Sequence, residues 1–350
     1  MAAYSTNPPQ ELVKNLYEQF IEKFGEEVKP REGNNIRLAC PECKHKSLSC
    51  NISTGVFHCF HCSFGKGQKL YGPAIGFKEE KVDSELHIKV SNKLLECCPL
   101  YDVHKSYLKQ RGVHSPEKYK ICSVPFNIES ILLKHFSKEE LANSGYFYLT
   151  DTEFRASKAL SPRRILVPFW QGSAIIGLKS RANPYGDSDE PRYIAPRGSQ
   201  IKNRYWYIGK LTSADIIITE GELGAIAGCE TGIQTIGIPG IGNISNETLL
   251  NELTTHTENC KRKFLILDTD VGIYNDLAKL SLALKATKAL PNSCILYLPQ
   301  DKEDEKMDLD LYINRHGTDN LEHQMELAWK NKDKITEQIE NYVKEKTSRK

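Results

Sequence analysis

The sequence has no long apolar run. Hydrophobic residues make up 39% of its 350 residues and charged residues 26%, and no stretch is long enough to span a bilayer. Its first residues, Met1-Ala2-Ala3-Tyr4, do not begin a signal peptide. The chain also lacks the G-x-x-x-x-G-K-[ST] loop of nucleotide-driven motors. We therefore expect no membrane contact and no motor domain, in a chain long enough for two or three domains.

The eleven cysteines do not form the dense pattern of a disulfide framework. Seven are scattered, which indicates a reducing, cytoplasmic location, and four stand in two close pairs, Cys40-Pro41-Glu42-Cys43 and Cys59-Phe60-His61-Cys62. The spacing C-x2-C-x15-C-x2-C is typical of two tight turns that hold one tetrahedral Zn²⁺, with a hairpin between them turning at Thr54-Gly55. In so short a domain the zinc replaces a core, so we expect it to be structural.

Basic and aromatic residues surround the predicted zinc ligands, a mixture that suits single-stranded DNA because bases stack and phosphates are neutralised. They are Arg37, Lys44, Lys46, Phe57, Phe60, Phe64, Lys66 and Lys69. The alternative is a purely structural ribbon, and we expect two of the three phenylalanines to form the core of the hairpin. Upstream, apolar residues recur at helical spacing from Leu12 to Phe24, with Gly25 as a C-cap.

The net charge of +2 hides a segregation along the chain. Residues Glu153 to Lys210 contain eleven Lys or Arg and four Asp or Glu, whereas Ser213 to Arg315 contain sixteen acids and nine bases. The basic block includes two expected strands, Arg163–Phe169 and Ile175–Arg181, joined around Gly172. A basic block beside an acidic one is what a polyanion groove next to a cation site requires.

Three acidic clusters dominate the second block. Short apolar runs end on Glu220-Gly221-Glu222 and on Asp268-Thr269-Asp270, and a third run, Cys294–Leu298, precedes Asp308-Leu309-Asp310. Such runs read as strands buried on both faces, and helical patterns lie between them at Leu223–Cys229, Glu247–Leu253 and Tyr274–Leu290. Alternating strands and helices predict a parallel α/β sheet, whose chemistry lies beyond the carboxyl ends of its strands. Converging carboxylates repel unless a cation joins them, and they select Mg²⁺ or Mn²⁺.

The order of these features resembles DnaG-type primases, in a phage-like variant with four zinc cysteines. E-G-E, D-T-D and D-L-D are similar to the TOPRIM domain of primases and topoisomerases, and Tyr107–Gly112 resembles the "YL-x-x-RG" element that opens the primase core. The resemblance implies an α/β, overall α+β, multidomain chain. Its expected parts are a zinc ribbon (1–72), a linker (73–94), a mixed basic subdomain (95–212), a TOPRIM domain (213–316) and one C-terminal amphipathic helix (317–350).

The resemblance also implies a function, template-directed synthesis of short RNA primers on single-stranded DNA from ribonucleoside triphosphates, with a replicative helicase acting in trans. Zinc would be held by Cys40, Cys43, Cys59 and Cys62. Two or more Mg²⁺ or Mn²⁺ ions would be held by Glu220, Asp268, Asp270, Asp308 and Asp310, which form the catalytic set. Nucleotide and DNA would be bound by Arg163, Arg164, Lys179, Arg181, Arg192 and Lys202.

One position departs from the family pattern. Where related sequences carry an acid four residues after the first glutamate, this chain has Gly224, and Glu222 could compensate. The alternatives are a non-catalytic zinc and TOPRIM protein of the recombination-mediator type, and a TOPRIM nuclease. The basic subdomain favours the primase over the mediator, and the absence of an ATPase domain weighs against the nuclease.

Overall fold

The computed structural model describes residues 20–21, 23–25, 28–32, 35–52, 55–62, 64–65, 68–69, 82–149, 153–186, 191–201, 204–212, 214–266, 277–301 and 307–348. The chain divides into two compact units, Met1–Glu80 and Lys81–Lys350. None of the described helices is both long and apolar enough to cross a membrane.

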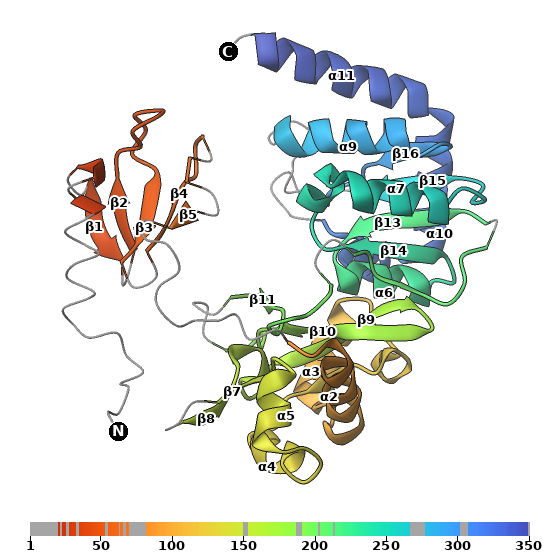
Figure 1. Ribbon diagram of the computed structural model, residues 1–350. Coiled ribbons are helices and arrows are strands. Elements are labelled where there is room, and N and C mark those ends of the chain that lie inside the picture. The colour runs from red at the N-terminus through yellow and green to blue at the C-terminus, as the bar shows by residue number, and fades with distance from the viewer. Residues whose placement is uncertain are drawn as a thin grey trace. The chain divides into compact units, whose positions relative to one another are not determined.

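The first unit is an antiparallel sheet in sequential order. Its strands are β1 (Lys29–Glu32), β2 (Asn35–Leu38), β3 (Leu48–Asn51), β4 (Val56–Cys59) and β5 (Gln68–Lys69) (Figure 1). Alternate residues such as Ile36, Leu38 and Leu48 face a small core, which Phe20 completes. Gly25, at φ 91°, ends the helical residues around Phe20, and its N–H donates to Ile21 O at 2.8 Å. The predicted C-cap and hairpin are confirmed.

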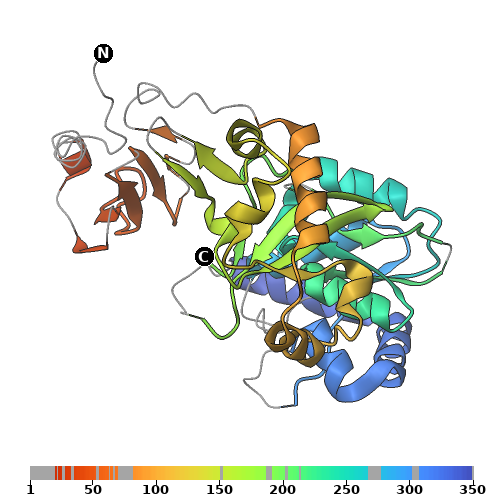
Figure 2. The same cartoon turned by 90° about the horizontal axis from the view of Figure 1, so that it is seen from below.

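The second unit begins with a mixed α+β half around a hairpin. Strands β9 (Ile165–Gly172) and β10 (Ala174–Arg181) are joined at Gly172, as expected. They are extended by the short strands β6 (Cys122–Ser123), β11 (Tyr193–Ile194) and β12 (Tyr207–Ile208). The rest of this half contains α2 (Ser84–Cys97), α3 (Asp102–Gln110), α4 (Ile128–Leu132), α5 (Lys138–Asn143), β7 (Phe147–Leu149) and β8 (Phe154–Ala156). Figure 2 shows α2, in orange, beside the yellow-green hairpin.

The predicted linker is too long at its C-terminal end, because residues 84–94 belong to α2. The Asp83 side chain begins this helix by accepting the N–H groups of Glu85 and Leu86 at 2.9 and 3.0 Å. Val90 and Leu94 are fully buried, so α2 packs as part of the hairpin's core and does not connect domains.

The other half is the expected parallel sheet, in the order β14-β13-β15-β16. Its strands are β13 (Ile216–Glu220), β14 (Gln234–Ile238), β15 (Lys263–Ile266) and β16 (Ser293–Leu296). Successive residues face opposite sides, so Ile216 and Ile218 pack in one core and Ile217 in another. Helices α7 (Glu247–His256) and α9 (Leu277–Ala289) cover the first core, and α6 (Glu222–Glu230) and α10 (Leu309–Lys330) contribute to the other (Figure 1). Strand β14 is an element that the sequence did not indicate.

The expected single C-terminal helix over 317–350 is wrong. Helix α10 starts upstream at Leu309 and contains a non-helical residue, Gly317 at φ 79°, and a separate helix α11 (Lys332–Ser348) follows. The apolar residues divide accordingly: Leu321 and Met325 pack in the core of Ile217, whereas Ile339 packs in that of Ile216. One straight helix could not reach both faces of a sheet, so the chain needs two.

Trp206 joins the two halves of this unit. Its backbone exchanges hydrogen bonds with Gly237 of β14 at 2.7 and 2.8 Å, and its indole N–H donates to Pro168 O of β9 at 3.0 Å. The side chain is fully buried, so the hairpin and the parallel sheet are packed as one body.

The close packing of α6 on β14 makes a stability prediction. A Cβ added to Gly228 would lie 2.3 Å from Thr235 Oγ1, so Gly228→Ala forces a backbone shift. We expect it to lower the free energy of unfolding by about 1–3 kcal/mol, measured by urea titration with tryptophan fluorescence.

Gly224→Ala in the same helix is the matched control, because its Cβ would make ordinary contacts at 3.4 Å with Thr219. There the higher helix propensity of alanine should leave stability unchanged or raise it by up to about 1 kcal/mol. Equal losses in the two variants would contradict the packing argument.

Candidate functional site

The four paired cysteines meet in the first unit. One sulfur ligand atom from each lies within 4.8 Å of the others, with Cys40 and Cys62 Sγ 3.6 Å apart and Cys43 and Cys59 Sγ 3.7 Å apart. Tight turns place them: Lys44 adopts φ 59°, and its N–H donates to Cys40 O at 2.9 Å. Four thiolates at this spacing suit tetrahedral Zn²⁺ with no open position. Among the described residues, no other group of three or more metal-binding side chains was found.

Hydrogen bonding favours the thiolate at one ligand. Burial opposes ionisation of Cys59, yet hydrogen bonds from the Ser47 hydroxyl and from the backbone of Cys62 and His61 lower its pKa. The Ser47 hydroxyl lies 3.2 Å from Cys59 Sγ. A deprotonated sulfur is the form that binds a metal, so this turn is prepared for a cation.

Among the described phenylalanines of the ribbon, Phe60 is the exposed one. Its side chain is 66% exposed, whereas Phe57 is buried and Phe64 packs against the core, as expected for two of the three phenylalanines. The Arg37 guanidinium lies 4.9 Å from the Phe60 ring centroid, and the His58 ring lies at the same distance. An exposed ring with a cation beside it is a surface on which an unpaired base can stack.

The acidic clusters follow the carboxyl ends of the parallel strands. Glu220 is the last residue of β13 and is half-buried, and Asp308 directly precedes α10. Asp268 and Asp270 lie outside the described residues; in the sequence they follow β15, which pairs in parallel with β13. The start of α10 is close by, because a Cβ on Gly224 would contact both Thr219 of β13 and Leu309. The described part of the expected cluster therefore gathers at one edge of the sheet.

Glu222 does not compensate for Gly224. Its side chain is 2% exposed, and its Oε1 accepts a hydrogen bond from Lys179 Nζ at 2.7 Å. This buried pair joins α6 to β10 and occupies the carboxylate. The same contact holds Lys179, one of the predicted phosphate-binding cations, against protein.

Arg111 pairs with the third acidic cluster, a contact that the sequence did not predict. Its Nη2 lies 3.3 Å from Asp308 Oδ2, and its Nε donates to Asp310 Oδ2. Burial disfavours the charged guanidinium, but Asp310, Tyr107 and Asp308 raise the pKa of Arg111 above its ordinary value. The arginine belongs to the Tyr107–Gly112 element, whose pattern alone gave no sign of this partner.

The predicted phosphate-binding cations differ in how much of each is accessible. Arg164 is 1% exposed and donates to Ser180 Oγ and to the Ser180 and Pro191 carbonyls at 2.7–3.1 Å. The expected phosphate contact is therefore wrong for Arg164. Its buried guanidinium binds backbone carbonyls and links the start of β9 to Ser180 and Pro191. Arg181 is 6% exposed between the rings of Tyr107 and Tyr193. Arg163 and Arg192 remain exposed, and Lys202 lies outside the described residues.

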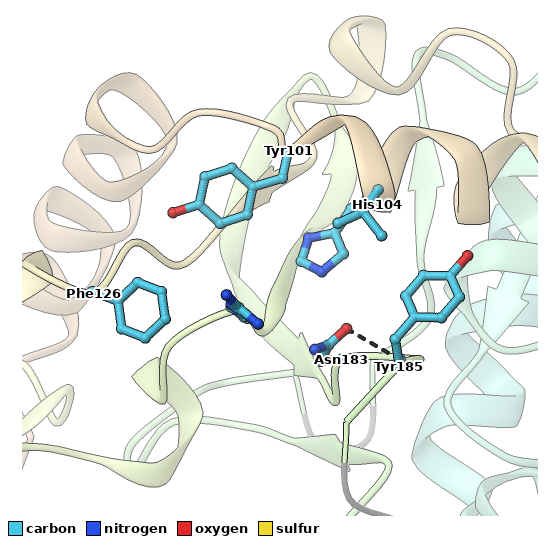
Figure 3. Close-up of a pocket in the computed structure, with 7 residues that line it drawn as sticks. Tyr101, His104, Phe126, Asn183 and Tyr185 are labelled. Carbon is cyan, nitrogen blue, oxygen red and sulfur yellow. Dashed lines mark hydrogen bonds between the residues drawn. The ribbon is translucent and has the colours of Figure 1, made fainter.

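A pocket of about 430 Å³ opens beside Arg163. Figure 3 shows aromatic rings around it and the Asn183 side chain at one wall. Its lining residues are Tyr101, Val103, His104, Phe126, Arg163, Asn183 and Tyr185. Phe126 and Tyr185 are 69% and 57% exposed, and the Arg163 guanidinium lies 5.2 Å from the Phe126 ring. Of these residues the sequence indicated Arg163 alone, since the others come from separate segments with no shared spacing.

Two polar side chains that line the pocket already form hydrogen bonds within the protein. Asn183 Oδ1 accepts the Tyr185 N–H at 3.2 Å, and His104 Nδ1 lies 2.7 Å from Ser123 Oγ. Burial lowers the pKa of His104, although the Asn183 side chain opposes the shift. The shift favours the uncharged imidazole. His104 is fully buried behind the pocket, so the Asn183 amide, the aromatic rings and the Arg163 guanidinium are the groups that a flat, polar-edged ligand with a phosphate could contact.

Comparison with known proteins gives likeness in structure and none in sequence. No protein-family model and no curated protein matches the chain. The zinc-binding and RNA polymerase domains of the Aquifex aeolicus primase superpose with a TM-score of 0.54 at 18% identity, over 90% of this chain and 85% of that one.

The RNA polymerase domain of Mycobacterium tuberculosis primase DnaG matches with a TM-score of 0.53 at 15% identity, over 69% of this chain and 83% of that one. The same domain in complex with a double-stranded DNA oligomer with a 6-nucleotide overhang matches with a TM-score of 0.51 at 14% identity. At these identities the likeness establishes the fold. The chain has the fold of the zinc-binding and RNA polymerase domains of DnaG-type primases.

Proposed function

We propose that the protein is a DNA primase, which synthesises short RNA on single-stranded DNA by metal-dependent nucleotidyl transfer. The observation that carries the proposal is the combination, in one chain of this fold, of a four-cysteine site with carboxylates at the edge of a parallel sheet. We assign the sheet to a TOPRIM domain on the E-G-E, D-T-D and D-L-D clusters. Ribonucleoside triphosphates are the proposed substrates, and a replicative helicase is the proposed partner in trans.

The donor set of the sheet edge fits a hard divalent cation. Glu220 and Asp308 offer carboxylate oxygens, and Asp268 and Asp270 would add theirs, which is the ligand type that Mg²⁺ or Mn²⁺ takes. Such an ion, when bound, stabilises the charge that develops on phosphoryl oxygens. The protein's own part is to hold these carboxylates at one edge, while the exposed cations Arg163 and Arg192 would meet the triphosphate or the template.

The template would be held by two aromatic surfaces, one in each unit. In the first unit Phe60 and Arg37 offer a stacking face, and in the second the pocket of Phe126, Tyr185 and Arg163 offers another. Both pair an exposed ring with a guanidinium, which binds unpaired bases with little sequence preference. These features support single-stranded DNA as the template.

A non-catalytic DNA-binding protein of the mediator type is the second candidate. It is favoured by Gly224 in place of an acid, and by the cations that already pair with Glu222, Asp308 and Asp310. One experiment separates the two: labelled ribonucleotides, single-stranded DNA and Mg²⁺, with short template-dependent RNA as the readout. Binding of DNA without any RNA product would favour the mediator.

The carboxylates generate the first functional prediction. Glu220→Gln and Asp268→Asn should each lower primer synthesis by roughly 10²-fold or more, because the lost charge would stabilise the transition state. Affinity for single-stranded DNA should stay within about twofold of the parent. Asp333→Asn, an exposed acid of α11, is the control and should leave synthesis unchanged. Full activity in Glu220→Gln and Asp268→Asn would remove these residues from the mechanism.

The zinc site generates the second functional prediction. Cys59→Ser should release the zinc, measured by metal analysis, whereas Cys50→Ala, a buried cysteine outside the cluster, should retain it. All three tryptophans belong to the second unit, so the thermal transition seen by their fluorescence should not move. We expect Cys59→Ser to lose initiation on single-stranded DNA and to keep extension of a supplied primer. Equal loss of both would contradict this division of labour.

The aromatic pocket beside Arg163 generates the third functional prediction. Phe126→Ala should weaken binding of an oligothymidylate about 5- to 150-fold, since stacking on an aromatic side chain contributes roughly 1–3 kcal/mol per base. Leu327→Ala removes an exposed apolar side chain outside the pocket and serves as the control. Fluorescence anisotropy at several salt concentrations measures both. If the two variants bind alike, the pocket does not hold a base.

A further inference from the structure

We infer that Arg111 is a positioning residue that is anchored by Asp310 and competes with the divalent cation for Asp308, so that Asp310 is not a metal ligand. This inference rests on the proposed function, because it concerns the same carboxylate cluster. It revises the ligand set expected from the sequence, in which Asp308 and Asp310 have equal roles.

The burial of the three side chains separates the two acids. The Asp310 side chain is 1% exposed, that of Asp308 is 14% exposed and that of Arg111 is 21% exposed. Arg111 Nε donates to Asp310, whereas Nη2 reaches Asp308 at 3.3 Å, a longer contact. A buried carboxylate that loses its cation is strongly destabilised, and a more exposed one can exchange partners with water or an ion. Asp310 is therefore the fixed partner of Arg111 and Asp308 is the exchangeable one.

The backbone around Arg111 is fixed by close packing. Gly112 adopts φ 69°, and a Cβ there would lie 3.0 Å from Asp310 O, so the glycine allows the end of α3 to approach the first turn of α10. Asn314 Nδ2 donates to Gln110 O at 3.3 Å and adds a second tie between these helices. The packing of α3 against α10 therefore holds the Arg111 guanidinium beside Asp308 and Asp310.

The charges account for the arrangement. Asp308 and Asp310 stand at the first turn of α10, where the helix favours anions. Two carboxylates so close still repel each other, and Arg111 supplies the nearby cation in the described structure. A divalent ion that binds Asp308 through Oδ2 must displace the Arg111 Nη2 contact, so this contact weakens metal binding there. Arg111 remains in place after the exchange, because Asp310 keeps it.

Mn²⁺ binding tests the inference without substrate. The full-length protein is titrated with Mn²⁺ and the bound ion is followed by electron paramagnetic resonance. Asp308→Asn should weaken binding about tenfold or more. The double variant Arg111→Gln/Asp310→Asn removes the buried pair together, leaves no unpaired buried charge, and should bind Mn²⁺ as tightly as the parent or roughly two- to fivefold more tightly. Thermal unfolding confirms that the variants are folded.

Arg315→Gln/Asp301→Asn is the matched control, because it removes another arginine–aspartate pair, 2.9 Å apart, whose arginine lies on the same helix. It should leave Mn²⁺ affinity unchanged. If the Arg111/Asp310 double variant loses as much affinity as Asp308→Asn, Asp310 is a ligand and the inference is wrong, while the proposed function stands. If the parent binds no Mn²⁺, both the inference and the metal-dependent function are wrong.

Discussion

The second unit depends on pairing buried carboxylates with cations that come from its other half. Glu222 and Asp310 belong to the parallel-sheet half and are 2% and 1% exposed, and their partners Lys179 and Arg111 come from the hairpin half. Removing one member of such a pair leaves an uncompensated charge in a low-dielectric interior, at a cost of several kcal/mol. The two halves therefore stabilise each other through charge, in addition to the packing around Trp206.

This pairing changes the meaning of the charge segregation. A basic block beside an acidic one suggests a polyanion groove, yet Lys179 and Arg164 are directed into the protein and Arg181 lies between two tyrosine rings. Part of the positive charge is therefore paired or covered within the protein. The exposed remainder, which includes Arg163 and Arg192, is a smaller surface than the composition indicates. A phosphate-binding role is most direct for these two among the described residues of the predicted set.

The sequence predicts elements whose signal is local. The zinc ligands follow from spacing, and β13 and β15 from apolar runs that end on acids. Strand β14, Gln-Thr-Ile-Gly-Ile, is interrupted by polar residues and a glycine and ends on no acid, so only its pairing with β13 reveals it. Helical periodicity at the C-terminus shows an apolar stripe but not which face of the sheet it covers, and here Met325 and Ile339 cover opposite faces. The aromatic pocket joins separate segments, so no spacing could indicate it.

The absent acid at Gly224 is explained by neither space nor strain. A Cβ at this position would make ordinary contacts with Thr219 and Leu309, so a side chain could begin there. The nearby Glu222 is neutralised by Lys179, and Asp310 by Arg111. The edge of the sheet therefore carries less unpaired negative charge than its sequence suggests. With fewer carboxylates, this edge of the sheet would bind a divalent ion less tightly. The folded protein would also need less cation there to offset the repulsion between carboxylates. The proposed metal site would therefore rely on Glu220, Asp308 and the acids after β15.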